Sequence, residues 1–222
     1  MKYGEYEAAF SPARLNKYRI ACGEDTRKAM MLYRCNMGLC QKYYSVIGVF
    51  EVVLRNAIDR HYRSHFNDAD WIVHQLQPGG ILEFTPHKAD ALKHYRQLNS
   101  KGIYTPDKML SAQSFGFWTY MFNKLPFNAG GKSLLDVFPK KQIGLRQRMV
   151  YNELKGIKLF RNRIAHYEPI CFDSRGNKCL FYAMMNYKQI VKYLEYLGYN
   201  EKRILYGFDV QTQKLMSKIM TI

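Results

Sequence analysis

The sequence is short of acidic residues and has no long apolar run. It contains 18 Asp and Glu against 34 Lys and Arg, which gives a net charge of +16. Such an excess favours a polyanionic partner, with nucleic acid as the first candidate and an anionic membrane surface as the second. No stretch approaches the roughly 18 apolar residues of a transmembrane helix, and the first residues lack the apolar segment of a signal peptide. We therefore expect a cytoplasmic protein without a membrane span.

The cysteines do not follow a metal-binding pattern. The five are Cys22, Cys35, Cys40, Cys171 and Cys179, and no two of them form a C-x-x-C pair. An odd number of cysteines without zinc-ligand spacing, in a chain without a signal peptide, is typical of reduced thiols that serve structure. We therefore expect neither a metal nor another cofactor.

Helical periodicity runs through most of the chain. Apolar residues recur mostly three and four positions apart, which indicates helices, and strand signals are few. We predict a single all-α domain over residues 1–222, with long N-terminal helices at 12–22 and 26–66, the second kinked or divided near 36–38 or at Gly48. The other predicted helices cover 85–100, a short segment from 105, 111–124, 143–167, 187–197 and 209–219. Loops are predicted at 67–85 and 126–131, and a turn at 174–177.

One stretch combines the groups needed to cut a phosphodiester without a metal. Arg161 is followed directly by Asn162, and His166 comes five residues after the arginine. These supply a fork of permanent positive charge, a carboxamide and an imidazole that titrates near neutral pH. The spacing itself is weak evidence, since about 0.4 matches are expected by chance, and Arg60 and His65 repeat it.

The helical geometry of this stretch creates a difficulty. Positions five apart lie about 140° apart around an ideal helix, so Arg161 falls on the side of the apolar stripe and His166 nearly opposite. That stripe comprises Val150, Leu154, Ile157, Phe160 and Ile164. Two arrangements bring the groups together: the helix ends between them, as Pro169 favours, or a twofold dimer places each motif beside its partner's copy.

Basic residues surround this stretch and only Glu153 opposes them between Pro139 and His166. A helix of this charge attracts a phosphate backbone, although a solvated basic face is the alternative interpretation. The predicted RNA-binding residues are Lys140, Lys141, Arg146, Arg148, Lys155, Lys158 and Arg163.

A second polar group lies on the otherwise apolar helix at 26–66. Glu51 and Arg55 are four apart and can pair, and Asn56 follows them. The group either fixes helix register as a buried ion pair or positions Arg161 and His166. Near the end of the same helix, Arg60 and His65 either form a second motif or extend the basic RNA surface. His61 and His65 are also four apart, but the zinc-protease pattern fails because no Glu follows His61.

Arg161-Asn162-Arg163-Ile164-Ala165-His166 resembles the Arg-x4-His signature of HEPN ribonucleases, which has a polar residue after the arginine. Further stretches narrow the resemblance to the abortive-infection (Abi) family of bacterial proteins, AbiD/AbiF type, over roughly residues 11 to 200. These stretches are Tyr33 to Asn36, Glu51 to Ile58, Ser114 to Trp118, Phe138-Pro139 and His166 to Ile170, in that order. Many relatives carry a second histidine where this chain has Tyr167.

The resemblance implies an all-α, HEPN-like helical bundle with extra helices and little or no strand. It also implies a homodimeric, metal-independent endoribonuclease that acts in phage defence or as a toxin. Arg161, Asn162 and His166 would be its catalytic residues. The expected partners are an RNA substrate and a structured noncoding RNA acting as antitoxin, with no membrane partner. The alternative is an RNA-binding protein without nuclease activity, which holds a structured RNA or a partner.

Overall fold

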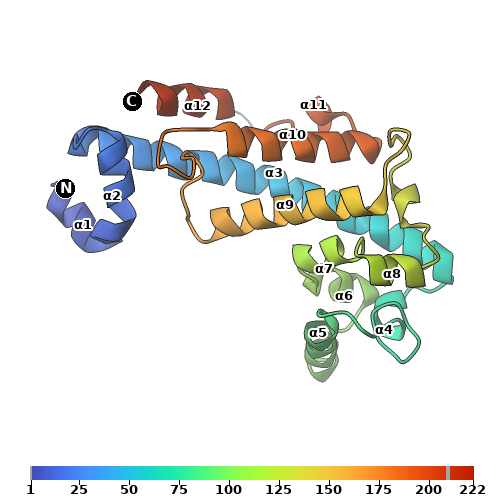
Figure 1. The fold of residues 1–222 in the computed structure, drawn as a ribbon. Helices are drawn as coiled ribbons and strands as arrows, with labels where there is room; N and C mark the ends of the chain where they lie inside the picture. Colours follow the sequence, from blue (N-terminus) through green and yellow to red (C-terminus); the bar gives the residue numbers. More distant parts are fainter. Residues whose placement is uncertain (1, 209–210) are drawn as a thin grey trace. The chain divides into compact units, whose positions relative to one another are not determined.

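The computed structural model of this chain describes residues 2–208 and 211–222 and confirms an all-α fold (Figure 1). Among these residues, pairing between extended segments is limited to one isolated antiparallel bridge between Phe172 and Lys178. The helices are α1 (Tyr3–Phe10), α2 (Pro12–Ala21), α3 (Thr26–Phe66), α4 (Trp71–His74), α5 (Lys88–Ser100), α6 (Pro106–Ala112), α7 (Phe115–Tyr120), α8 (Lys124–Ala129), the 3-10 helix η1 (Leu134–Val137), α9 (Gln147–Ala165), α10 (Phe181–Tyr196), α11 (Glu201–Ile204) and α12 (Thr212–Thr221).

Local capping residues place the N-terminal helices where the sequence predicts them. Ser11 accepts a hydrogen bond from the Arg14 amide at 3.4 Å and opens α2 with Pro12 at its first position, as expected for a hydroxyl cap. Asp25 Oδ1 accepts from the amides of Arg27 and Lys28 at the start of α3. That helix is uninterrupted over 41 residues, so the predicted division does not occur. Helix α1 was not predicted.

The middle of the chain differs more from the prediction. The segment predicted as a helix over 111–124 is divided, because Ser114 and Asn123 each cap a new helix, α7 and α8. The predicted loop at 126–131 is wrong in its first part: Pro126 is the third residue of α8, where its missing N–H costs no helical hydrogen bond. Trp71 and its neighbours form the short buried helix α4 inside the predicted loop at 67–85.

Two helix starts are wrong for identifiable reasons. Thr85 does not cap α5, because its hydroxyl donates to the Leu82 carbonyl at 3.0 Å, and the helix begins only at Lys88. Helix α9 begins at Gln147 rather than 143, after Gly144 adopts a positive φ of 85°. Thr105 does cap α6, accepting from the Lys108 amide at 3.1 Å.

The C-terminal helices also extend beyond their predicted bounds. Helix α10 begins at Phe181, before the predicted 187, and ends just before Gly198, while α11 was not predicted. The predicted start of the last helix at Asp209 lies outside the described residues, and α12 itself runs from Thr212 to Thr221. The predicted turn at 174–177 is present: Asp173 accepts hydrogen bonds from the Arg175 and Asn177 amides, both at 2.9 Å.

The chain forms two compact units, and α3, α9 and α10 each contribute residues to both. Unit 1 comprises residues 1–48, 159–190 and 201–222, and unit 2 comprises 49–158 and 191–200. In unit 1, the start of α12 and the first part of α10 line a common groove with Tyr43, and α12 runs from there away from α10 (Figure 1). No helix among the described residues is both long and apolar enough to cross a membrane.

The core of unit 2 is aromatic, and a partly buried polar contact joins α9 to α10 within it. Phe115, Phe117, Trp118 and Phe122 are buried, so the aromatic run of α7 serves as core rather than as an exposed stacking surface. The Tyr193 hydroxyl donates to Glu153 Oε2 at 2.5 Å, and Lys192 Nζ lies 2.6 Å from the same oxygen. The acidic residue that interrupts the basic run is therefore neutralised within its own unit.

A buried asparagine, Asn36, links α3 to the segment after α9 in unit 1. Asn36 is fully buried, and its Oδ1 accepts a hydrogen bond from the Ile170 amide at 3.0 Å. Its Nδ2 lies 3.7 Å from Cys40 Sγ. Asn36 thereby satisfies a buried backbone donor in the segment that follows α9, 134 residues further along the chain.

Replacing Asn36 with leucine should lower the free energy of unfolding by about 1–3 kcal/mol, because the buried Ile170 amide loses its acceptor. The measurement is urea denaturation of both proteins. Asn99→Leu, at an exposed position on α5, is the control and should change stability by less than about 0.5 kcal/mol. Equal midpoints for the two variants would show that the Asn36 hydrogen bond contributes nothing to stability.

Candidate ribonucleolytic site

Helix α9 presents the predicted motif on two different sides. The predicted apolar stripe is confirmed, since Val150, Leu154, Ile157, Phe160 and Ile164 are all buried. Phe160 anchors this end of the helix in unit 1, with edge-on ring contacts to Tyr43 at 5.5 Å and to Tyr182 at 5.4 Å.

Arg161 lies on the buried side of α9 but keeps its hydrogen-bonding groups available. Its side chain is half-buried, and its guanidinium carbon lies 5.9 Å from the centroid of the Tyr44 ring. Within residues 2–208 and 211–222, the structure gives this guanidinium no hydrogen bond and no ion pair. A cation held by an aromatic face, with its N–H fork unused, can bind a phosphate in two-point geometry.

His166 is the C-terminal cap of α9 and is exposed. Its amide still donates to the Asn162 carbonyl at 3.0 Å. The next two amides then close the helix: Tyr167 N–H bonds to the Ile164 carbonyl at 3.0 Å and Glu168 N–H to the Arg163 carbonyl at 2.9 Å. This pair of bonds is a Schellman motif, which requires a left-handed residue after the cap. Tyr167 fills that position with a φ of 56°, where glycine is usual.

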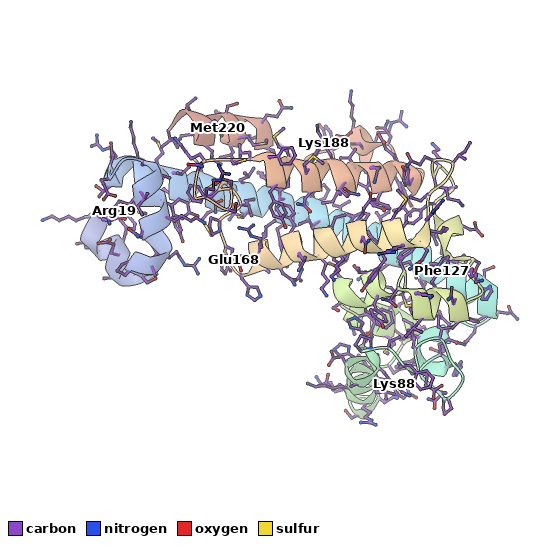
Figure 2. All side chains as sticks on the ribbon, viewed as in Figure 1. Arg19, Lys88, Phe127, Glu168, Lys188 and Met220 are labelled. Carbon is purple, nitrogen blue, oxygen red and sulfur yellow. The ribbon has the colours of Figure 1, made fainter. Side chains whose placement is uncertain are left out.

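Tertiary contacts fix the segment after the helix end. Arg14 of α2 donates to the Tyr167 carbonyl at 2.9 Å, and Arg163 donates to the Pro169 carbonyl at 2.8 Å. Arg163 also forms an ion pair with Glu168 at 3.3 Å and lies over the Tyr182 ring. Glu168 is labelled beside the end of α9 in Figure 2. With the bond from Asn36 to Ile170, these contacts hold a left-handed tyrosine that costs about 1–3 kcal/mol by itself.

The helix end does not bring His166 round to Arg161. Helix α9 does end between the two residues, as one predicted arrangement required. However, the His166 amide completes a regular helical bond to Asn162, so the backbone reaches His166 along the helical path. The angle of about 140° between the two positions therefore persists. Within this chain, Arg161 faces α3 and His166 faces solvent.

The predicted RNA-binding residues fall into two groups. Lys140, Arg146, Arg148 and Lys155 are exposed, and in the described part of the chain their side chains have no hydrogen-bond or ion-pair partner. The remaining three are half-buried. Arg163 is engaged at the helix end, and Lys141 pairs with Asp136 at 3.2 Å while donating to the Leu135 carbonyl. Lys158 lies close enough to His87 to lower its pKa, after the larger effect of burial.

Glu51, Arg55 and Asn56 are half-buried in unit 2, whereas Arg161, Asn162 and His166 belong to unit 1. Arg55 Nε donates to Asn56 Oδ1 at 3.4 Å. This contact joins sequence neighbours and does not decide between the two interpretations. The Glu51–Arg55 pair and the role in positioning the motif both stay predictions.

The second Arg-x4-His match lies in unit 2, on an open groove of about 510 Å³ that Arg60, His61 and His65 help to line. The two histidine rings stack at 6.0 Å, and His61 Nε2 lies 2.9 Å from Ser133 Oγ. Because the Ser133 hydroxyl donates to the Gly130 carbonyl, His61 must be the donor in its bond to Ser133. Burial, and then the nearby His65, lower the pKa of His61. This histidine therefore favours its neutral form, unlike a basic RNA contact.

Two residues that shape the site were not predicted to do so. Tyr44 fits the apolar period of the helix at 26–66 and carries no further signal, yet its ring lies under the Arg161 guanidinium. Arg14 had no local signal, since its contact with Tyr167 joins residues 153 apart in the sequence. A search of protein-family models, of curated proteins and of solved structures finds no match to this chain.

Tyr167→Val should lower the free energy of unfolding by about 1–2 kcal/mol, because a β-branched residue is poorly tolerated at positive φ. Tyr167→Gly should stay within about 0.5 kcal/mol of wild type, since glycine accepts this backbone and offsets its own entropy cost. Guanidinium denaturation measures both. Tyr206→Val is the control at an exposed tyrosine without positive φ, and an equal loss there would exclude backbone conformation as the cause.

Proposed function

We propose that this chain is a metal-independent endoribonuclease of the HEPN type that acts in phage defence as an abortive-infection effector or toxin. The observation that carries the proposal is the accessibility of both defining residues of the Arg-x4-His motif, Arg161 and His166. Arg161 lies against Tyr44 and its N–H groups have no partner among the described residues, and His166 is exposed at a helix end closed by hydrogen bonds. Exposed Lys140, Arg146, Arg148 and Lys155 add positive charge for an RNA backbone.

The chemistry follows from the three side chains. His166 takes the proton of a ribose 2′-OH as that oxygen attacks the adjacent phosphorus, or returns a proton to the leaving 5′-oxygen. Arg161 stabilises the negative charge that grows on the phosphoryl oxygens. Asn162 orients the histidine or the arginine, or bonds across the dimer. The products are a 2′,3′-cyclic phosphate and a 5′-OH, and DNA is resistant because it lacks the nucleophile.

A homodimer would resolve the geometry of the motif. In one chain Arg161 and His166 lie on different sides of α9, so one chain alone cannot place both on a single phosphate. We propose that a twofold axis puts His166 of each protomer opposite Arg161 of the other, as isologous interfaces allow. A structured noncoding RNA that restrains the enzyme would bind the same basic residues.

RNA binding without cleavage is the second candidate, because the exposed basic residues of 140–155 would serve an RNA-binding protein equally well.

Purified protein should cut RNA in EDTA, leave matched DNA intact and yield cyclic phosphate ends. His166→Ala should slow cleavage by about 10²–10⁴-fold, with unchanged RNA affinity. The matched control is His65→Ala, which removes the histidine at the same spacing on α3 and should cut normally. Absence of cleavage by wild type, with tight RNA binding, would establish the binder instead.

The dimer has its own test in mixtures of inactive variants. Arg161→Ala and His166→Ala should each be inactive, yet after mixing and subunit exchange they should regain about a quarter of the wild-type rate. Half of the protomers then sit in mixed dimers, each with one intact composite site. The control is each variant mixed with itself. A site contained in one chain would give no recovery, whatever the mixing ratio.

A further inference from the structure

A groove in unit 1 lies directly beside the motif and is unused by the chemistry described above. It has a volume of about 490 Å³ and opens to solvent. Gln41, Tyr44 and Ser45 of α3 line it on one side, and Ile164, Ala165 and Tyr167 line it at the end of α9. These last residues are the immediate neighbours of His166, and Tyr44 carries Arg161.

We propose that this groove holds one nucleobase of a single-stranded RNA, in the nucleotide whose phosphate Arg161 binds. The proposal rests on the proposed function for its substrate, but base binding can be measured without cleavage. It adds a feature that the motif alone does not supply. The groove would select unpaired RNA, because a paired and stacked base cannot enter it.

Two exposed aromatic rings support a base rather than an aliphatic group. The Tyr44 side chain is 48% exposed and that of Tyr167 is 59% exposed, although both are large enough to be core residues. The Arg161 guanidinium carbon lies 5.9 Å from the centroid of the Tyr44 ring. Tyrosine faces and guanidinium planes are the usual stacking partners of unpaired bases.

The polar groups of the groove suit a neutral heterocycle with a hydrogen-bonding edge. Gln41 is exposed, and its carboxamide offers a donor and an acceptor side by side. Ser45 donates to the Gln41 main-chain carbonyl at 3.1 Å, so the amide is the polar group left to meet a base edge. No carboxylate lines the groove among the described residues. Burial raises the pKa of the Cys40 thiol to about 12, so this lining residue is also uncharged and does not repel a phosphate.

The backbone at Tyr167 fixes the position from which the ring projects. Its left-handed conformation is closed by the Schellman bonds on one side, and its carbonyl is held by Arg14 on the other. A rigid aromatic side chain loses little freedom when a base stacks on it. The strained residue beside the histidine thereby has a use that a glycine in its place would not have.

The experiment measures binding of a short fluorescent single-stranded RNA to His166→Ala protein, which does not consume it under the proposed function. Tyr167→Gly in this background removes the ring but keeps the backbone, and Gln41→Ala removes the amide. Tyr167→Gly should weaken binding by about 5- to 100-fold. Tyr206→Ala, at a tyrosine 86% exposed elsewhere in unit 1, should leave binding unchanged.

An abasic nucleotide moved along the same RNA identifies the base. At one position the abasic nucleotide should weaken binding to protein that contains Tyr167. At that position the two proteins, with Tyr167 and with Tyr167→Gly, should then bind RNA equally, because the ring has no base to stack on. A merely structural role for Tyr167 would leave the difference at every position and overturn the proposal. Cleavage by wild type, with no effect of Tyr167→Gly or Gln41→Ala on binding, would remove the base site and keep the nuclease. Base-dependent binding without cleavage by wild type would support the base site and exclude the nuclease.

Discussion

The closure of α9 is the constraint on which the candidate site depends. Two backbone hydrogen bonds close the helix, and three further bonds hold the following segment through the side chains of Arg14, Asn36 and Arg163. Because two of these side chains come from α2 and α3, the position of His166 is set by the packing of the whole N-terminal part of unit 1. A mobile histidine would lose the orientation that proton transfer requires.

The same closure separates Arg161 from His166. Arg161 is drawn onto Tyr44 by the buried side of α9, whereas the cap geometry leaves His166 in solvent. A monomer therefore holds the two halves of the proposed site apart. Under the proposed function, association of two chains, rather than folding alone, would complete the catalytic group.

How much the sequence predicts depends on the range of the interaction. Ser11, Asp25 and Thr105 act within three residues, so their helix starts were predicted correctly. Thr85 has the same local pattern but bonds backward to Leu82, a choice made by the packing of the preceding turns. The predicted start of α10 is too late in the chain. Phe181, Met184 and Met185 are exposed apolar residues, and they obscure the helical period of its first turns. Arg14 and Asn36 form hydrogen bonds with the segment after α9, more than 130 residues further along the chain. Sequence periodicity gives no information on contacts of that range.

The two compact units are interleaved along the chain, with unit 1 assembled from three segments and unit 2 from two. Each segment boundary at 48, 158 and 190 falls inside a helix, α3, α9 or α10 respectively. No truncation can therefore isolate either core without cutting a helix. A cut in α3, α9 or α10 shortens a helix that both units need. The two cores must therefore be inherited, duplicated or lost together.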